Sequence, residues 1–318
     1  MKPKVKVKPK VKVKPKPLEA GRRGSKLLAP LSNADKVFWP GEGYTKLDLA
    51  RFYQTVFPRL APYIKERLLS LERCPDGMRG ECFYQKEKPK GMPADTPTKR
   101  IGHATASDKS TNYVVGGSLA TQIALVNLGC IAVHIMATRA SSPRRPDWLC
   151  IDIDPGSGEF RDAAQAGLQV KEVLDSLKLV SFAKTSGGRG MHVMVPIRRG
   201  PDADDVLAFA RALVARIAAS HPDKLTVEHS IAARRGRAYL DPFRNAFGQT
   251  VVAPYSVRRR EHAPVSTPLA WSEIRPDLVP SSFNLGNFEL RLKKSDPWKD
   301  FFRKRQSLKD AARLLQKL

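Results

Sequence analysis

Two aspartates that stand two residues apart, Asp152 and Asp154, are the clearest candidates for chemistry in the sequence. They alternate with Ile151 and Ile153 in an apolar segment that is typical of a β-strand. Alternate residues of a strand point to the same face, so the two carboxylates would converge while the isoleucines enter the core. Carboxylates held together repel each other unless a cation joins them, and a divalent ion with oxygen ligands would do so. The alternative is a pair of exposed carboxylates without a ligand.

A third carboxylate, Asp241, ends the apolar stretch 238–240 and is followed by a polar loop with Arg244. Three acidic ligands could hold two metal ions bridged by a triphosphate, as phosphoryl-transfer enzymes do. Alternatively, Asp241 is a turn residue that accepts a hydrogen bond from its own backbone. The sequence therefore predicts a catalytic, metal-binding trio of Asp152, Asp154 and Asp241.

The segment 185–192, Thr-Ser-Gly-Gly-Arg-Gly-Met-His, could bind the anionic side of such a substrate. Its glycines let backbone N–H groups approach phosphate oxygens, Arg189 adds charge, and His192 adds a side-chain donor. A simple hairpin turn with a packed histidine is the alternative. The segment is not a P-loop, because the sequence G-x-x-x-x-G-K-[ST] is missing, and no Ser/His/Asp hydrolase elbow is present.

The chain carries a large positive charge. Fifty-six lysines and arginines against 31 acidic residues give +25, and removing the eight lysines of residues 1–17 still leaves +17. Such a field attracts polyanions, so nucleic acid is the expected partner; a solubilising surface is the alternative. An anionic membrane is not expected, because no basic amphipathic helix is evident.

The cysteines and the apolar segments indicate in which cellular compartment the protein is expected. Four scattered cysteines form no C-x-x-C pair, so neither a zinc ribbon nor a dense disulfide framework is indicated, and reduced thiols are expected. No apolar run is long enough to span a bilayer, and the N-terminus lacks the apolar core of a secretion signal. We expect a cytoplasmic protein, on the nucleoid if the source is a bacterium.

Three regions follow from composition. Residues 1–30 begin with a repeated Lys/Pro/Val tract and are predicted to form a disordered basic arm. Residues 31–295 are predicted to form the catalytic domain, and residues 296–318 a C-terminal basic helix. Within the domain, periodicity predicts a helix over 46–60 capped by Thr45, strands within 67–88, a helix over 117–130 and a strand over 131–135.

The second half alternates more clearly between strands and helices. The patterns predict a strand at 148–154, a helix at 159–178 with Leu168 on its inner face, and strands on both sides of the glycine segment. A helix at 203–219 with Asp202 as N-cap and a strand before Asp241 complete the order. This order indicates an α/β (α+β) fold with a split, mixed sheet like that of RNA-recognition domains, plus an N-terminal α/β layer.

Several segments together resemble one family. The strings NADKVFWPGEGYTKLDLARFY, ERCPDGMRGECFYQKE, CIDIDPG, TSGGRGMHVMVP, YLDPFRNAFGQTVVAPYSVR and APVSTPLAW are similar to the primase-polymerase domain of bacterial DNA ligase D, of the archaeo-eukaryotic primase superfamily. The similarity runs in order from about residue 31 to about residue 290. It implies a polymerase that fills gaps at broken DNA ends, with manganese or magnesium as cofactor.

The resemblance also assigns residues. Asp152, Asp154 and Asp241 match the family's metal ligands, and Arg189 stands where the family usually has lysine. The positions implied to bind the nucleotide are His134, Ser186, Arg189, His192, Arg244, Arg258 and Tyr84. Those implied to bind the 5′-phosphate of a DNA end are Asn33, Lys36 and Lys46, which solvated surface residues would equally explain. Phe83 and Tyr84 match an aromatic pair of which one stacks on a base, although Phe83 could also pack in the core.

The expected function is a stand-alone primase-polymerase that adds ribonucleotides or deoxyribonucleotides to a 3′-hydroxyl at gaps and overhangs. The resemblance implies Ku as a partner. A separate ATP-dependent ligase is expected too, because no K-x-D-G ligase signature is present. Two alternatives remain open: a non-catalytic module that binds 5′-phosphorylated ends and recruits a ligase, and a metal-dependent nuclease. Nucleotide preference, metal, templating and oligomeric state do not follow from the sequence.

Overall fold

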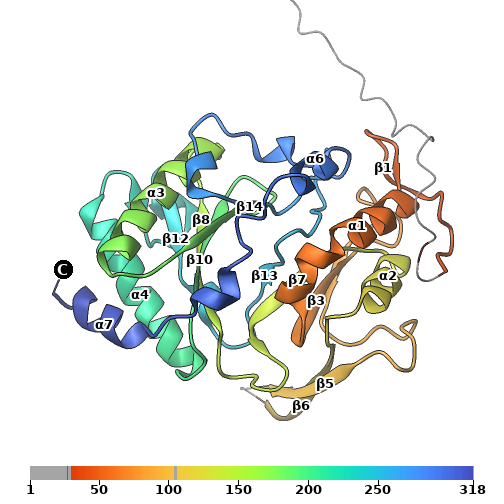
Figure 1. The fold of residues 1–318 in the computed structure, drawn as a ribbon, viewed down its shortest axis with the longest axis horizontal. Helices are drawn as coiled ribbons and strands as arrows, with labels where there is room; N and C mark the ends of the chain where they lie inside the picture. The colour runs from red at the N-terminus through yellow and green to blue at the C-terminus, as the bar shows by residue number, and fades with distance from the viewer. Residues whose placement is uncertain (1–26, 28–29, 104–105, 318) are drawn as a thin grey trace, which may run out of the picture.

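Two sheets lie side by side in the computed structural model, each covered by helices on its outer face (Figure 1). The structure describes residues 27, 30–103 and 106–317, so the predicted basic arm lies almost wholly outside the described residues. The mixed α/β fold is as expected, with the split sheet in the second half of the chain and an α/β layer in the first half.

The larger sheet has the strand order β11-β12-β8-β10-β9-β14. Its neighbours are antiparallel except for the parallel pair β11 and β12. Its strands are β8 (Trp148–Asp154), β9 (Phe182–Thr185), β10 (Met191–Pro196), β11 (Leu225–Thr226), β12 (Ala238–Asp241) and β14 (Pro268–Leu269). The chain order β8-α3-β9-β10-α4-β12 is the one predicted, with β11 and a short helix inserted before β12.

Helices α3 (Phe160–Ser176) and α4 (Ala203–Ser220) bury their apolar faces against this sheet. Asp202 caps α4 in a capping box with Asp205, as the sequence suggested. Leu168 is the exception on α3: we expected it on the inner face, but it is 39% exposed. Ala164 and Gly167, which are small, face the sheet instead and let α3 approach closely.

The second sheet has the order β13-β7-β3-β4, and α1 (Lys46–Ile64) and α2 (Leu119–Asn127) cover it. Its strands are β3 (Arg67–Arg73), β4 (Phe83–Gln85), β7 (Cys130–Arg139) and β13 (Val251–Val252). Thr45 caps α1 together with Asp48, as predicted. The sequence analysis did not predict the hairpin of β5 (Thr98–His103) and β6 (Ala106–Val114), which lies at the bottom of Figure 1.

Shorter elements complete the described chain. They are β1 (Val37–Trp39), β2 (Tyr44–Thr45), α5 (Ile231–Arg234), α6 (Phe288–Leu292), α7 (Leu308–Leu315) and the 3-10 turns η1 (Phe243–Asn245), η2 (Trp271–Glu273), η3 (Pro280–Ser282) and η4 (Phe301–Lys304). The region 296–318, predicted as one basic helix, therefore holds η4 and α7. No helix in the described part of the chain is long and apolar enough to cross a membrane.

A buried ion-pair cluster ties the two sheets together. Asp147, directly before β8, accepts from Arg67 Nη2 at 2.5 Å and from Arg139 Nε at 2.7 Å. Asp147 and Arg67 are completely buried, where β7 meets β8. Burial would raise the pKa of the Asp147 carboxyl, but the two arginines outweigh it and hold that pKa below its usual value. The cluster thus fixes how β8 lies against the second sheet.

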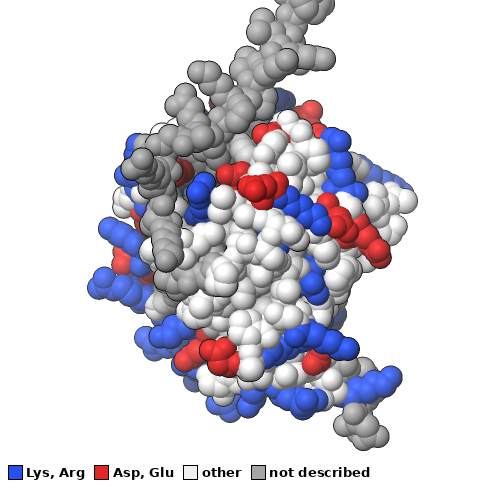
Figure 2. Space-filling model, turned by 90° about the vertical axis from the view of Figure 1, so that its right-hand side faces the viewer, with Lys and Arg blue, Asp and Glu red and all other residues white. Residues whose placement is uncertain are grey.

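The surface charge is unevenly arranged. On the face that Figure 2 shows, which is the right-hand side of Figure 1, lysines and arginines are mixed with acidic residues around a broad uncharged centre. The positive excess of the chain forms no continuous basic surface on this face. Arginines gather instead around the pocket described next.

Candidate functional site

A row of polar side chains crosses the larger sheet. Strand pairing places Lys184 of β9 opposite His192 of β10, His192 opposite Asp152 of β8, and Asp152 opposite Asp241 of β12. Residues paired in this way lie on the same face of a sheet. Asp154 lies two residues beyond Asp152 on the same strand, where it faces the same way. The structure therefore brings together the three aspartates that the sequence analysis selected.

Each carboxylate of the row has a defined partner. His192 Nε2 lies 3.2 Å from Asp152 Oδ1. Arg244 Nε lies 3.0 Å from Asp152 Oδ2 and 3.4 Å from Asp241 Oδ2, so this guanidinium stands between the two acids. Asp241 Oδ1 accepts from the backbone N–H of Phe243 at 2.7 Å. Asp241 thus accepts a hydrogen bond from the backbone of its own turn, as the alternative interpretation held, and it is also a direct neighbour of Asp152.

The turn after β12 is anchored to β8. The side chain of Asn245 accepts from the Cys150 N–H at 2.8 Å and donates to the Cys150 carbonyl at 2.7 Å, two residues before Asp152. It also donates to the Pro242 carbonyl at 2.7 Å. Asn245 is 1% exposed, so these bonds form in the interior, where they are worth most. They set Asp241 in position against Asp152.

The acidity of the three aspartates differs. Burial would raise the pKa of Asp152, but His192 and Arg244 outweigh it and hold that pKa well below its usual range. Burial raises the pKa values of Asp154 and Asp241, and the nearby charge of Asp152 raises both further. Arg244 and Arg234 lower these two pKa values but do not outweigh burial and the charge of Asp152, so the cluster is short of positive charge.

The donor set suits a divalent cation. Carboxylate oxygens are the ligands that magnesium and manganese prefer. Within the described residues, no group of three or more histidine, cysteine, aspartate or glutamate side chains is arranged to hold a metal ion. Arg244 Nε occupies the space between Asp152 and Asp241 that a shared cation would need. The residues fit a metal in their chemistry, with Arg244 as the group that must move aside.

A pocket of about 760 Å³ opens over this row, where the two sheets meet. Among the residues expected to take part in catalysis or nucleotide binding, those that line it are Tyr84, His134, Asp152, Asp154, Ser186, Arg189, His192, Arg244 and Arg258. Asp241 does not line it, because Arg244 lies against its outer oxygen. One cavity therefore gathers segments that lie up to 176 positions apart in the chain, from Tyr84 to Arg260.

The glycine segment forms the turn between β9 and β10, as predicted. Ser186 Oγ donates to the Gly190 carbonyl at 2.9 Å, and Arg258 Nη1 donates to the Ser186 carbonyl at 3.0 Å. A Cβ at Gly190 would lie 2.3 Å from the Ile153 carbonyl oxygen, so only glycine lets the turn lie against β8. Gly187 has a φ of +70°, which other residues rarely adopt. The turn presents Arg189 and backbone to the pocket.

The structure adds residues that sequence reasoning missed. Arg234 Nη1 lies 3.6 Å from Asp154 Oδ2, and Arg260 lines the pocket. Lys184 is completely buried in the polar row, with Nζ donating to Ser266 Oγ at 2.6 Å. Burial lowers its pKa to about 7. The arginine-rich runs 234–237 and 258–260 were a signal for the first two, whereas nothing local in the sequence marks Lys184.

The residues implied to bind a 5′-phosphate lie together elsewhere, around the start of α1. The Lys46 N–H donates to the Lys36 carbonyl at 2.8 Å, and the Lys36 N–H to the Asn33 carbonyl at 3.1 Å. Lys46 is buried, with Nζ donating to the Ser32 carbonyl at 2.8 Å, so it is not a solvated surface lysine. Burial lowers its pKa, and the nearby charge of Lys36 lowers it further. Lys36 pairs with Asp76 at 2.5 Å.

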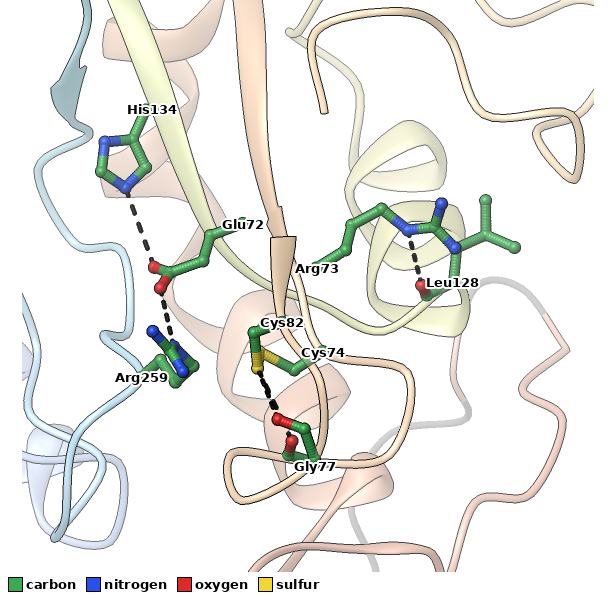
Figure 3. Close-up of a disulfide and its surroundings, with 9 residues drawn as sticks. Glu72, Arg73, Cys74, Gly77, Cys82, Leu128, His134 and Arg259 are labelled. Carbon is green, nitrogen blue, oxygen red and sulfur yellow. Dashed lines mark hydrogen bonds and ion pairs between the residues drawn. A yellow bond between two sulfur atoms is a disulfide. The ribbon is translucent and has the colours of Figure 1, made fainter. Parts of the chain in front are cut away.

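A disulfide corrects one expectation. Cys74 and Cys82 are bonded (Figure 3), although the scattered spacing led us to expect reduced thiols. Cys130 and Cys150 are free and buried. The turn around Gly77, whose φ is +80°, reverses the chain and brings the two cysteines together. The closed loop holds Asp76 and leads directly into β4.

The aromatic pair that follows the disulfide divides between two roles. Tyr84 is 60% exposed and packs edge-on against His134, with ring centroids 5.4 Å apart. Phe83 is 40% exposed and lies under the Arg73 guanidinium at 5.3 Å, so it is not a core residue. Tyr84 is therefore the aromatic side chain of this pair that reaches the pocket.

Comparison with known proteins places the chain in a family. A family model described as LigD, primase-polymerase domain, matches residues 45–298. The bifunctional non-homologous end joining protein LigD of Bacillus subtilis is 31% identical over 292 residues, which are 89% of this chain and 46% of that protein. The multifunctional non-homologous end joining protein LigD of Pseudomonas aeruginosa is 32% identical over 295 residues, 89% of this chain and 34% of that protein.

This chain thus spans less than half the length of these curated relatives. A solved structure, the polymerase domain from Mycobacterium tuberculosis ligase D in complex with DNA, matches with a TM-score of 0.81 at 25% identity, over 88% of this chain and 100% of that one. The matched span contains the polar row, the glycine turn and the pocket. The chain belongs to the family of LigD primase-polymerase domains, as its sequence motifs predicted.

Proposed function

We propose that this chain is a nucleotidyltransferase that adds nucleotides to a 3′-hydroxyl at DNA gaps and double-strand breaks, in bacterial non-homologous end joining. The observation that carries the proposal is Asp152 placed directly opposite Asp241, beneath a pocket lined by Arg189, Arg244 and Arg258. A nucleoside triphosphate is bound through metal cations and through positive side chains. The carboxylates of this site suit the cations, and the guanidiniums suit the phosphates. The curated relatives named above are end-joining proteins, which supports the same reaction class.

Different side chains of the pocket bind different parts of the nucleotide. Arg189 and Arg258 neutralise the triphosphate, and the Ser186–Gly190 turn brings backbone close to its oxygens. Arginines fixed around the phosphates stabilise the negative charge that builds up on the departing pyrophosphate. Tyr84 offers an exposed ring on which the base stacks without regard to its identity.

The three aspartates of the polar row are the binding site for the metal cofactor. Asp152, Asp154 and Asp241 would hold two divalent cations, manganese or magnesium, which would supply activation of the 3′-hydroxyl and neutralisation of the pyrophosphate charge. His192 orients Asp152 through the 3.2 Å contact with Oδ1. The N–H of Phe243 fixes one oxygen of Asp241 and leaves the other turned toward Asp152. The chain thereby sets the direction of each carboxylate.

The cluster of Asn33, Lys36 and Lys46 binds the 5′-phosphate on the far side of a gap. Lys36 is available for this because its partner Asp76 is 72% exposed, and an exposed ion pair is exchanged at little cost. Ku and an ATP-dependent DNA ligase are the partners that such a reaction needs, one to hold the ends and one to seal them. DNA as substrate places the protein on the bacterial nucleoid.

One assay tests the reaction class. Labelled DNA with a gap and a 5′-phosphate is incubated with the protein, Mn²⁺ or Mg²⁺, and either ribonucleoside or deoxyribonucleoside triphosphates. We expect extension of the labelled strand, and weaker discrimination for the 5′-phosphate in a Lys36→Ala variant. Shortening of the strand would assign a nuclease, and retention without extension would assign a binding module; either result refutes the polymerase.

A further inference from the structure

Glu72 is a buried carboxylate behind the wall of the pocket, and the polymerase chemistry above gives it no role. It is 4% exposed and lies on β3, with Tyr84 of β4 opposite on one side and Ala132 of β7 on the other. Figure 3 shows Glu72 between His134 and Arg259. A buried carboxylate is costly unless its oxygens are satisfied, so its partners point to its purpose.

The two oxygens of Glu72 are in different situations. Oε1 accepts from Arg259 Nε at 2.9 Å. Oε2 lies 3.9 Å from His134 Nε2, and both of these buried atoms lack a hydrogen-bond partner in the described structure. A carboxylate oxygen and a ring nitrogen complement each other as acceptor and donor. A contact of this length needs only a small movement to become a hydrogen bond, as such contacts often do when a substrate binds.

The contact determines which ring nitrogen of His134 carries the proton. A neutral imidazole has one N–H, and a carboxylate beside Nε2 favours the proton on that atom, which leaves Nδ1 as an acceptor. Burial lowers the pKa of His134, which favours the neutral ring. Tyr84 packs edge-on against the ring at an interplanar angle of 83° and opposes its rotation.

His134 is the member of this pair that a substrate in the pocket can reach. His134 lines the pocket whereas Glu72 does not, and Nε2 is buried. In Figure 3 the second ring nitrogen lies on the side of the ring away from Glu72. An acceptor at Nδ1 does not suit ionised phosphate oxygens, which are acceptors themselves. It suits a donor, and the donors common to all nucleotides are the sugar hydroxyls.

We propose that Glu72 is a positioning residue that holds His134 protonated on Nε2, so that Nδ1 accepts a hydrogen bond from a sugar hydroxyl of the bound nucleotide. The second half of this statement rests on the proposed function, because it requires a nucleotide in the pocket. The first half concerns the protein alone. Glu72 acts as an acceptor, so a neutral acceptor at this position should serve as well.

The tautomer is measured by NMR on protein with ¹⁵N-labelled histidine, without nucleotide. The His134 signals are assigned by their loss in His134→Gln. We expect a proton on Nε2 and none on Nδ1 in the parent, a mixture of tautomers in Glu72→Leu, and the parent pattern in Glu72→Gln. Glu261→Gln, which removes one exposed acidic charge, is the matched control and should change nothing. A proton on Nδ1 in the parent overturns the proposal whether or not the variants fold, and an unchanged tautomer in Glu72→Leu does so as well.

Nucleotide affinity tests the second half. Loss of one hydrogen bond of about 0.5–1.5 kcal/mol predicts roughly two- to tenfold weaker binding of a ribonucleoside triphosphate by Glu72→Leu. The 2′-deoxy and 3′-deoxy triphosphates identify the hydroxyl, because the nucleotide without it should lose no further affinity in the variant. If Glu72→Leu weakens the binding of both deoxy triphosphates as much as that of the ribonucleotide, no sugar hydroxyl is the partner of Nδ1, and this part of the proposal is refuted. If the parent binds no nucleotide, the proposed function fails, whereas the tautomer result still decides the role of Glu72.

Discussion

Replacing Arg244 by glutamine should change metal binding and nucleotide binding in opposite directions. Arg244 Nε lies 3.0 Å from Asp152 and 3.4 Å from Asp241, where a shared cation would bind, so the guanidinium must be displaced before a metal enters. Hydrogen bonds to charged groups contribute about 1.5–3 kcal/mol when buried. The Arg244 side chain is 40% exposed, so we reduce this to about 1 kcal/mol for solvent screening.

Arg244→Gln should therefore bind Mn²⁺ roughly fivefold more tightly than the parent in the absence of nucleotide. Its affinity for a nucleoside triphosphate should fall, because one guanidinium has left the pocket. Free Mn²⁺ is measured by electron paramagnetic resonance during a titration. Arg260→Gln is the matched control: it removes the same charge from the same pocket, and Arg260 has no ion pair with either aspartate in the described structure. Equal or weaker Mn²⁺ binding by folded Arg244→Gln would show that this side chain does not occupy the metal position.

Three further predictions concern stability. Asp147→Asn should lower the free energy of unfolding by about 3–5 kcal/mol in urea titrations, because it leaves a buried arginine without its charge partner; a loss below about 1 kcal/mol would contradict this. The pKa of Lys184, lowered to about 7, means that the unfolded chain binds more protons than the folded one between pH 7 and the ordinary lysine value, so the parent should gain stability over this range. Lys184→Met should therefore be more stabilising, relative to the parent, at pH 7 than at pH 9. The difference in the free energy of unfolding should change by up to roughly 1.4 kcal/mol per pH unit. The same difference at both pH values would refute the lowered pKa of Lys184. Reducing the Cys74–Cys82 disulfide should cost about 2.5 kcal/mol by loop entropy, whereas Cys74→Ser should be insensitive to the reductant; thiol counting and thermal unfolding with and without reductant test both, and a parent that is fully reduced as purified would contradict the bond.

Local sequence patterns predicted the elements well where the pattern itself determines the structure. The alternation around Asp152 and Asp154 specified a strand and the side on which both carboxylates lie, since that depends only on a period of two. The capping residues Thr45 and Asp202 were identifiable because caps depend on neighbours three positions away. Leu168 was misplaced, because helical periodicity does not show how far the sheet extends over the helix.

The site required information that the sequence does not carry locally. Asp241 is opposite Asp152 because of the register between β12 and β8, which Asn245 fixes through bonds across 95 residues. The same holds for Lys184, whose place in the row depends on two strand pairings. The Cys74–Cys82 bond was missed because spacing alone cannot show that a turn reverses the chain. The nucleotide-binding roles of His134, Arg258 and Tyr84 came from the family resemblance alone. These roles and the metal-binding roles of the three aspartates stay predictions until they are tested.

The central claim is that Asp152 and Asp154 act with Asp241 as one catalytic centre. Its most direct test is strand extension on gapped DNA with Mn²⁺ and nucleoside triphosphates, comparing the parent with Asp152→Ala and Asp154→Ala, while DNA binding is followed in the same samples. We predict that extension falls to background in both variants and that binding to the DNA end remains. Extension at the parent rate by either variant would contradict the catalytic assignment.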